Sequence, residues 1–319
     1  MSGTLILPSG GTVVGLSTDR VPTIVVEAGP DTVRRYLEFF AASIRNANTR
    51  AAYLIASQKF FTWCEQLDIG PLHGLQRVHV AAYIEQLTQM QSAPTVKQNL
   101  AALRMLFEFL RVPAENPADK VRGPKHVVRT GRTPVLSAPQ ARQLLESIPT
   151  STLTGLRDKA LLSVMVYSFA RISAVVGLDV PDYHYHGARR WFRLHEKGGK
   201  EHAVPVHHRA EEYIDLYLSE AGIADGPLFR TTDHGRVTLR RFDRFAAWQM
   251  VKRRAKAAGL PESTTNHTFR ATGITTYLEN GGTIENARNI AAHASIRTTQ
   301  CYDRRGESVT LDEINRIQL

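Results

Sequence analysis

A short, strongly basic segment divides this chain into two parts of different character. Residues 120–132 read KVRGPKHVVRTGR, with five basic residues, two glycines and no acid. A stretch of this composition is typical of a linker between domains rather than of a core. Because a linker that only joins domains has no need of positive charge, we interpret it as a segment that crosses a phosphate backbone; a solvated loop is the alternative. The 319 residues are therefore expected to form two domains.

The part before the linker carries apolar side chains at helical spacing. Residues 1–30 are rich in Gly, Ser, Thr and Pro, and we expect an extension that is flexible or pairs weakly as a strand. Beyond it, apolar residues recur at steps of three and four, which predicts helices that begin at Asp31 and near Asn48 and that cover 78–90 and 95–110. Four short helices predict a small helical bundle over residues 31–119.

The part after the linker (120–136), residues 137–319, mixes helical and strand-like patterns. Helices are predicted over 137–148, 156–169, 207–221 and 237–258. Two strand-like runs, 191–195 and 203–206, flank Gly198 and Gly199 and predict a β-hairpin. The expected fold class is therefore mainly α, with a small β-hairpin or sheet in the second domain.

The predicted helix 237–258 concentrates positive charge. Arg240, Arg241 and Arg244 lie near its start, and four more cations follow at 252–256 against a single acid, Asp243. We expect its cations to face outward while its apolar residues hold it to a core, namely Leu239, Phe242, Phe245, Ala246 and Met250.

The overall charge favours a polyanionic partner. The formal net charge is +10 and the pI is near 9.8, which points first to nucleic acid and second to an acidic membrane surface. A merely basic soluble protein is the alternative. The longest apolar run, 160–170, is too short to span a bilayer, and the N-terminus does not resemble a signal peptide, so membrane association is not expected. Two cysteines allow neither a disulfide framework nor a cysteine zinc site, which fits the cytosol.

Four residues of the second domain have the chemistry of an anion site. His267 and Arg270 are three apart, a spacing that puts both on one face of a helix. An imidazole beside a guanidinium suits a phosphate whose charge grows in the transition state. Arg171 follows an apolar helical pattern and can bind an anion in a cleft, whereas Lys197, in a glycine-rich turn, can donate a proton to a leaving alkoxide. Singly, each also fits an ordinary surface side chain.

Tyr302 lies nine residues after His293. Residues 280–282 (NGG) end the helix of His267, and Thr283 caps a further helix that ends at His293. A turn over 295–299 then presents the tyrosine. A phenol with the usual pKa of about 10 is a poor nucleophile unless cations or a base surround it, which Arg171, Arg270 and His293 can provide. The combination predicts a site that attacks a phosphodiester with a tyrosine.

In this order and at these spacings, the residues resemble the tyrosine recombinases, the family of phage integrases and Xer-type recombinases. The family has Arg, a hairpin Lys, His-x-x-Arg, His or Trp, and Tyr nine positions later; the corresponding positions are Arg171, Lys197, His267, Arg270, His293 and Tyr302. The GGK after the lysine, the run HASIRTTQ before the tyrosine and the Asn116-Pro117 pair before the linker also match. The resemblance covers roughly residues 31–310.

The resemblance implies a fold and a mechanism. The bundle would be a SAM-like core-binding domain, and a mostly helical catalytic domain would clamp DNA from the opposite face. The arginines and histidines would bind the scissile phosphate, and Tyr302 would attack it to give a 3′-phosphotyrosine while Lys197 protonates the leaving 5′-oxygen. Because the phosphotyrosine keeps the bond energy, no ATP, metal or other cofactor would be needed.

The resemblance also implies partners. The substrate would be double-stranded DNA with a specific core site, and a homotetramer, monomeric or weakly associated when free, would exchange strands through a Holliday junction. Residues 309–319 would dock on a neighbouring protomer. We expect integration, excision or resolution of mobile DNA in the cytoplasm, on the nucleoid; the target site and the need for accessory proteins stay open. Further DNA contacts are expected from Lys120, Arg122, Lys125, Arg129, Arg132, Arg240, Arg241 and Arg244.

Two positions depart from the family pattern. The family usually has an acid three residues after the first arginine, where this chain has Ala174, and a glycine two before the late histidine, where it has Ala291. The acid helps to orient the active-site cluster, so its loss is expected to slow catalysis or to shift its work to another residue. Two alternatives follow: a recombinase relative kept only for DNA binding, and a DNA relaxase of the type IB topoisomerase class.

Overall fold

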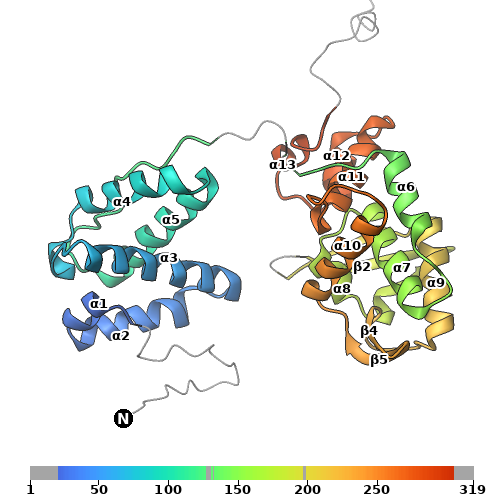
Figure 1. Cartoon of the computed structure of the whole chain (residues 1–319), viewed down its shortest axis with the longest axis horizontal. Coiled ribbons are helices and arrows are strands. Elements are labelled where there is room, and N and C mark those ends of the chain that lie inside the picture. Colours follow the sequence, from blue (N-terminus) through green and yellow to red (C-terminus); the bar gives the residue numbers. More distant parts are fainter. Residues whose placement is uncertain (1–20, 127–130, 132, 197–198, 305–319) are drawn as a thin grey trace, which may run out of the picture. The chain divides into compact units, whose positions relative to one another are not determined.

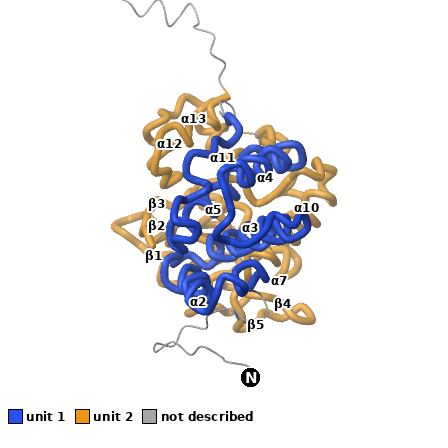
Figure 2. The backbone as a smooth tube through the Cα atoms, turned by 90° about the vertical axis from the view of Figure 1, so that its left-hand side faces the viewer, with its two compact units in different colours: residues 1–127 blue, residues 128–319 orange. Residues whose placement is uncertain are grey.

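The computed structural model of the chain describes residues 21–126, 131, 133–196 and 199–304, which are coloured in Figure 1. The chain divides into two compact units, Met1–Val127 and Val128–Leu319, distinguished by colour in Figure 2. The predicted fold class is confirmed, because the described residues are mainly helical and carry small antiparallel sheets. No helix among them is long and apolar enough to cross a membrane. Several predicted functional positions lie outside the described residues: Arg129, Arg132, Lys197 and 309–319.

The secondary-structure elements of unit 1 are all helical among its described residues, and its last part, 111–126, is turn and loop. Its elements are α1 (Thr23–Glu27), α2 (Pro30–Glu38), a π-helical turn (Phe39–Ser43), α3 (Ala47–Gln66), a 3₁₀ turn (Leu72–Gly74), α4 (Arg77–Met90) and α5 (Ala93–Leu110). The four predicted helices correspond to α2 to α5. The prediction of a flexible or strand-like extension is wrong for 23–27, where Val25 on α1 is fully buried and packs into the core of the bundle.

Aromatic rings fill the centre of this bundle. Phe60 and Phe61 of α3 both pack edge-on against Phe107 of α5, with ring centroids 6.0 and 6.1 Å apart. The phenol of Tyr36, on α2, lies 3.0 Å from the hydroxyl of Ser57 on α3. Large rings bury much apolar area and prefer such edge-on contacts, so this cluster holds α2, α3 and α5 together.

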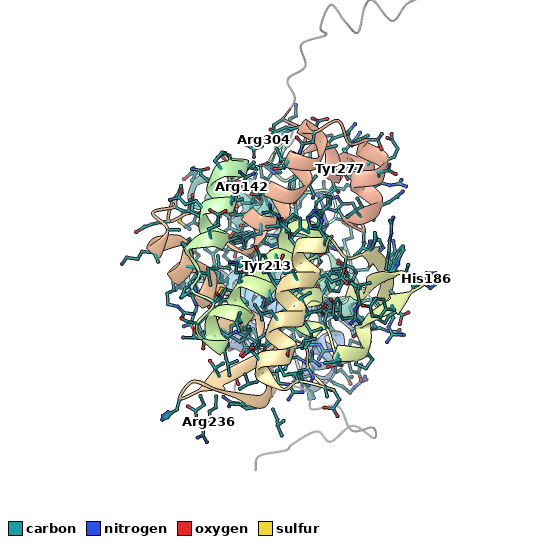
Figure 3. All side chains as sticks on the ribbon, turned by 90° about the vertical axis from the view of Figure 1, so that its right-hand side faces the viewer. Arg142, His186, Tyr213, Arg236, Tyr277 and Arg304 are labelled. Atoms are coloured by element: carbon teal, nitrogen blue, oxygen red, sulfur yellow. The ribbon has the colours of Figure 1, made fainter. Side chains whose placement is uncertain are left out.

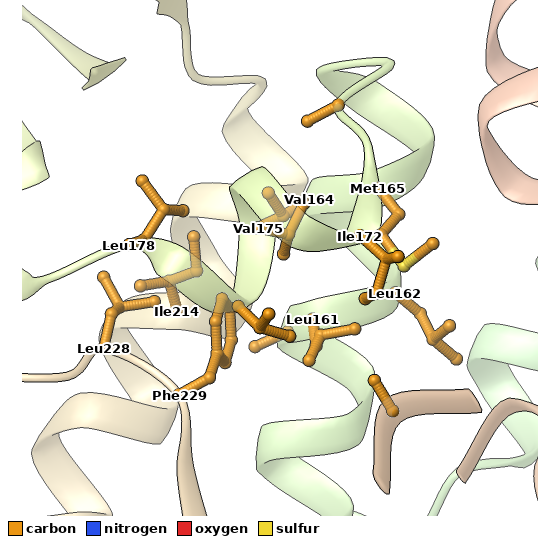
Figure 4. Packing of buried hydrophobic residues seen from close by; sticks show 14 of the residues in the cluster. Leu161, Leu162, Val164, Met165, Ile172, Val175, Leu178, Ile214, Leu228 and Phe229 are labelled. Atoms are coloured by element: carbon orange, nitrogen blue, oxygen red, sulfur yellow. The ribbon is translucent and has the colours of Figure 1, made fainter. Parts of the chain in front are cut away.

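Unit 2 is built around one buried helix, α7. Its helices are α6 (Ala138–Ser147), α7 (Leu153–Tyr167), α8 (Ile172–Gly177), a 3₁₀ turn (Val180–Asp182), α9 (His208–Ala221), α10 (Arg244–Ala257), α11 (Asn266–Glu279), α12 (Ile284–Ile290) and α13 (Ile296–Gln300). Figure 4 shows the packing around α7, where Leu161 and Met165 meet Val175 of α8 and Ile214 of α9 in one apolar cluster. Because both faces of α7 are buried, the elements around it are fixed relative to one another.

A three-stranded antiparallel sheet lies in unit 2. Its order is β1 (Tyr183–His186), β2 (Arg189–Glu196) and β3 (Lys200–Pro205). The predicted hairpin corresponds to β2 and β3, in which Glu196 pairs with Lys200, whereas β1 was not predicted. The pairing therefore sets the end of β2 directly before the position of the predicted catalytic lysine.

The predicted helix over 237–258 is wrong in its first part. A second hairpin, β4 (Arg230–Asp233) and β5 (Arg236–Arg241), occupies that region. Its two-residue loop has positive φ at His234 (45°) and Gly235 (78°), as in the turns that suit tight hairpins. Arg240 and Arg241 thus lie on a strand. The helix itself, α10, begins at Arg244, where the carboxylate of Asp243 accepts from the next amides as an N-cap.

The predicted apolar face of that segment is also partly wrong. Phe242 and Met250 are buried as expected, at 5% and 1% exposure. Leu239 and Phe245 instead are 83% and 65% exposed. Leu239 lies on β5 and Phe245 on α10, and the change from strand to helix between Arg241 and Arg244 turns these two side chains away from the core, since the two elements have different periods.

Candidate active site

Helix α11 carries the predicted pair His267 and Arg270 and is held closely on α7. Its start is fixed by a capping box in which the Thr265 amide donates to Thr268 Oγ1 at 3.0 Å. A Cβ at Gly273, farther along α11, would lie 2.1 Å from the carbonyl oxygen of Val166. Only glycine allows the two helices to approach this closely, so the position of the pair is set by backbone packing.

Arg270 is a buried cation, at 2% exposure. Its guanidinium donates to two main-chain carbonyl oxygens, those of Phe169 and Ala291, the second at 2.6 Å. Burial first, and then the neighbouring charge of Arg171, lower the pKa of Arg270 to about 10, while Glu196 and Tyr302 oppose this shift. Arg270 therefore stays charged at neutral pH, in a fixed orientation and with little water to screen it.

Arg171 stands at the start of α8, at its N-cap position. Its Nη1 donates to Oε2 of Glu196, the last residue of β2. The Arg171 side chain is 31% exposed, whereas that of Glu196 is 3% exposed. Sequence reasoning missed Glu196, because nothing local marks an acid 25 residues away as the partner of Arg171. Ala174, at the position where the family pattern expects an acid, is buried.

The end of α12 directs His293 into the site. Ala292 has a positive φ of 48°, its amide donates to the Asn289 carbonyl at 3.0 Å, and the His293 amide donates to the Arg288 carbonyl at 3.1 Å. This is a Schellman ending, which usually has glycine at the residue of positive φ. Ala291, in contrast, has an ordinary φ of −78°, so alanine in place of the family's glycine meets no backbone conflict there.

His293 is buried and lies between Thr299 and Tyr302. Its Nδ1 is 2.9 Å from the Thr299 hydroxyl, and its ring stacks on that of Tyr302, with centroids 5.8 Å apart. Burial, and then the charges of Arg270 and Arg171, lower the pKa of His293 to about 3. The imidazole is therefore neutral at physiological pH.

Tyr302 is anchored to helix α11, which also carries Arg270. The segment predicted as a turn is the short helix α13, and the Tyr302 amide donates to the Thr299 carbonyl at its end, at 2.9 Å. The Tyr302 carbonyl accepts from Thr275 Oγ1 of α11 at 3.0 Å, and the ring packs on a cluster that includes Phe169 and Ile274. Tyr302 thus shares its support with Arg270.

The first residues of unit 2 are hydrogen-bonded to the segment around Tyr302. The Gly131 amide donates to the Cys301 carbonyl at 2.7 Å, and Arg304 donates to the carbonyls of Gly131 and Thr133 at 3.1 and 2.9 Å. A Cβ at Gly131 would lie 2.9 Å from the Cys301 carbonyl oxygen. Figure 3 shows Arg304 at one end of unit 2, opposite Arg236 of the β4–β5 hairpin. The residues on both sides of Tyr302 are therefore tied to the start of the unit.

The structure brings five of the six predicted catalytic residues into one neighbourhood. His267 lies at its exposed rim, and partial burial, Arg270 and Arg171 lower its pKa. The charges of the same two arginines also lower the pKa of His293, and Tyr302 raises the pKa of Arg270, so these side chains lie close enough to interact electrostatically. The sixth residue, Lys197, lies outside the described residues, although Glu196 directly precedes it.

A cationic recess adjoins His293. It is lined by Lys200, His202, Arg288, Asn289, Ala292, His293 and Ala294. His202 of β3 forms a 3.0 Å hydrogen bond with the Ile290 carbonyl, which joins the β2–β3 hairpin to the end of α12. Sequence reasoning missed this recess, because its residues come from a strand and a helix that are distant in the chain.

The predicted DNA-binding residues are of two kinds. Lys120, Arg122 and Lys125 of unit 1 are exposed, as are Arg240 and Arg244 of unit 2. Lys120 and Arg122 line a groove with Arg77 of α4. Arg241 is different, because its guanidinium donates to the carbonyls of Val176 and Leu178, both at 2.9 Å, and pairs with Asp179. It joins β5 to the end of α8.

Comparisons with known proteins bear on both units. The model of the phage integrase family matches residues 134–307, and that of the phage integrase N-terminal SAM-like domain matches 33–112. The tyrosine recombinase XerD of Chlorobaculum tepidum is 29% identical over 269 residues, which cover 81% of this chain and 86% of that protein.

Two solved structures have a similar fold. The XerH site-specific recombinase bound to difH substrate, in a pre-cleavage complex, aligns with a TM-score of 0.67 at 18% identity, over 96% of this chain and 91% of that one. A lambda integrase tetramer bound to a Holliday junction aligns with a TM-score of 0.66 at 17% identity, over 88% and 79% of the two chains.

Proposed function

Because the chain belongs to the phage integrase family and is a tyrosine-type site-specific recombinase, we propose that Tyr302 is its nucleophile. Arg171, Arg270, His267 and His293 bind the scissile phosphate in this proposal. The observation that carries it is the stacking of Tyr302 on a buried neutral histidine, on the same support as the buried cation Arg270. A phenol held beside fixed positive charge has what a phosphodiester attack requires.

The proposed reaction exchanges one phosphodiester for another. The Tyr302 oxygen forms a bond to phosphorus while the bond from phosphorus to the 5′-oxygen breaks, which leaves a 3′-phosphotyrosine. Lys197 gives its proton to the leaving 5′-oxygen, and the phenol proton goes to solvent or to a nearby base. In the reverse direction, a 5′-hydroxyl attacks the phosphotyrosine and rejoins the strand. No net bond energy is lost, so the cycle requires no ATP and no metal.

The neutral state of His293 defines its part in this reaction. When the Thr299 hydroxyl donates to Nδ1, the single ring proton of a neutral imidazole is on Nε2. His293 then acts as a hydrogen-bond donor to a non-bridging phosphate oxygen, not as a charge. Arg270 supplies the charge: it is buried, fixed by two carbonyls and ionised at neutral pH, so it needs no reorganisation as negative charge grows on the phosphate.

We further propose that both units contact the DNA backbone. Exposed cations from the linker region, including Lys120, Arg122 and Lys125, and from the start of α10 support this. Arg129 and Arg132 belong to the same proposal on the basis of the sequence alone. Arg240 and Arg244 precede the exposed Phe245 in the chain, and Phe245 stacks on Trp248 at 5.8 Å between centroids. This segment therefore offers charge for phosphates and apolar area for bases. Arg241 contributes to DNA binding indirectly, because it holds in place the strand β5 that carries Arg240.

The finer biological role is also a proposal. We propose that four protomers act on two duplexes through a Holliday junction and that they move, excise or resolve mobile DNA in the cytoplasm, on the nucleoid. The likeness to the lambda integrase tetramer on such a junction supports this assembly. The proposal leaves open whether accessory proteins are needed. A binding-only role is less well supported, because five predicted catalytic residues meet in one site.

Covalent trapping tests the proposed chemistry. The protein is incubated with duplexes from the regions that flank its own gene, nicked near candidate sites so that the short product strand diffuses away and the phosphotyrosine accumulates. We expect a protein–DNA band that resists detergent and is absent with Tyr302→Phe. Tyr277→Phe is the matched control, since Tyr277 packs on the same cluster around Phe169. Relaxation of supercoiled plasmid at many sites would instead support the topoisomerase alternative.

A further inference from the structure

We infer that Glu196 is a positioning residue for the reaction: its carboxylate holds the Arg171 guanidinium toward the scissile phosphate. This inference rests on the proposed function and deepens it, because it adds a residue to the same site. The contact that carries it joins Nη1 of Arg171, at the start of α8, to Oε2 of Glu196, at the end of β2.

The burial of Glu196 indicates that the contact is built into the fold. Only 3% of its side chain is exposed, against 67% for Glu201 on the neighbouring strand β3. A carboxylate loses its hydration when it is buried, and this cost is offset only by a cation or by hydrogen bonds. Arg171 supplies both, because an arginine–carboxylate contact is a charge-assisted hydrogen bond.

Without a partner, the Arg171 side chain would not be held in one orientation. Its side chain is partly exposed and long, and the nearby charge of Arg270 repels it. Glu196 acts on Arg270 with the opposite sign, which shows that its charge is felt by both arginines. A carboxylate whose charge acts on both cations reduces their repulsion before DNA binds, and its contact with Arg171 selects one orientation of that side chain.

No residue of α8 can do this work. The helix reads ISAVVG, and Ala174, one turn after Arg171, has a buried methyl group where a carboxylate is expected in the family pattern. The acid therefore comes from a different element. Because Glu196 directly precedes Lys197, the same ion pair also fixes the strand end from which the predicted proton donor extends.

The geometry favours positioning over blocking. A guanidinium has five N–H donors, and Glu196 is engaged through Nη1. Donors thus remain for a phosphate oxygen when DNA binds. If Glu196 instead competed with the phosphate for Arg171, its removal would speed cleavage, so the two roles predict changes of opposite sign.

The test is single-turnover cleavage of a nicked core-site duplex by Glu196→Gln. Glu201→Gln is the matched control, an exposed glutamate in the same hairpin. We expect Glu196→Gln to form the covalent adduct about 10- to 100-fold more slowly, in line with the loss of a residue that orients a catalytic group, and the control to match the wild type. DNA affinity and the unfolding temperature are measured in parallel. Adduct formation by the wild-type protein, checked first, tests the proposed function separately.

A second substrate identifies the residue through which Glu196 acts. A duplex with sulfur in place of the bridging 5′-oxygen has a leaving group that needs no proton, so its cleavage bypasses Lys197. The defect of Glu196→Gln is expected to persist on this substrate, because Arg171 stabilises the phosphate with either leaving group. A defect that disappears with sulfur overturns the role through Arg171, as does cleavage at the wild-type rate or faster. If Glu196→Gln folds poorly, Glu196→Asp keeps the charge and must cleave faster than the Gln variant; equal rates also overturn the inference.

Discussion

The imidazole of His293 and the phenol ring of Tyr302 lie almost parallel, with ring planes 11° apart and centroids 5.8 Å apart. The two residues are joined by α13, whose buried Thr299 contacts both: its hydroxyl bonds the imidazole and its carbonyl accepts from the Tyr302 amide. The spacing of nine residues between histidine and tyrosine is therefore the length of chain that this short helix requires.

The first prediction concerns the hydroxyl of Thr299. Thr299→Val keeps the shape of the side chain but removes the hydrogen bond to His293 Nδ1, so the ring proton is no longer directed to Nε2. We expect the rate of adduct formation to fall by about tenfold, with DNA affinity unchanged. Thr298→Val, at an exposed position of the same helix, is the control and should cleave normally. Equal rates for the two variants would show that the hydroxyl does not orient the histidine.

The second prediction concerns pH. In the unfolded chain a histidine binds a proton below a pH of about 6.5. In the folded chain His293 stays neutral down to a pKa of about 3. Between these values the unfolded state binds more protons than the folded state. The contribution of His293 to the free energy of unfolding is therefore fully present above a pH of about 6.5 and falls by about 1.4 kcal/mol for each pH unit below that value.

Denaturant unfolding at several pH values between 7 and 4 checks this. His293→Gln should show a shallower loss of unfolding free energy toward acid pH than the wild type. His186→Gln, at an exposed position of β1, should keep the wild-type slope. The same slope in all three proteins would contradict a neutral, buried His293.

The third prediction concerns the backbone at Ala292. Its φ of 48° is unfavourable for a residue with a Cβ, by about 1 kcal/mol, and glycine is free of this cost. Ala292→Gly should therefore raise the free energy of unfolding by up to about 1 kcal/mol. Ala294→Gly, at a position without a positive φ, should lower it slightly, because it only makes the unfolded chain more flexible. Thermal and denaturant unfolding give the sign directly.

The fourth prediction concerns the start of α10. If Arg244 contacts a phosphate, Arg244→Gln should weaken binding to all duplexes alike and reduce the slope of log affinity against log salt by about one. Arg34→Gln is the control, because Arg34 is an exposed arginine of α2 that is paired with Asp31 and Glu38. A salt slope that is unchanged in Arg244→Gln would remove this residue from the DNA interface.

Much of the helical framework could be predicted because its signals are local. The sequence predicts a helix from about residue 137 and a cap at Thr283, and the side chains of Ser137 and Thr283 both accept the amide hydrogen bonds of N-caps. The β4–β5 hairpin was missed although it also has a local signal, the pair His234-Gly235 before Val237 and Thr238. Those two β-branched residues favour a strand, whereas the arginines that follow them recur at helical spacing and predict a helix.

The candidate site was only partly predictable, for a physical reason. The identities and spacing of His293 and Tyr302 can be recognised from the sequence alone. The pairing of Arg171 with Glu196 cannot, because it depends on how α8 packs beside β2. The sequence predicts a turn where the short helix α13 forms, because five residues are too few for a periodic pattern. Likewise, the buried state of Arg270 follows from the packing of α11 on α7, which only tertiary contacts define.

The most direct test of the central claim is to identify the residue that bears the DNA. The trapped complex of the full-length protein is digested with a protease and a nuclease, and the peptide that carries a nucleotide is sequenced by mass spectrometry. We predict a phosphotyrosine at Tyr302, linked to the 3′-end of the cleaved strand, and no such peptide from Tyr302→Phe. A nucleotide on Tyr277 or on any other residue, or an adduct that persists in Tyr302→Phe, would contradict the account.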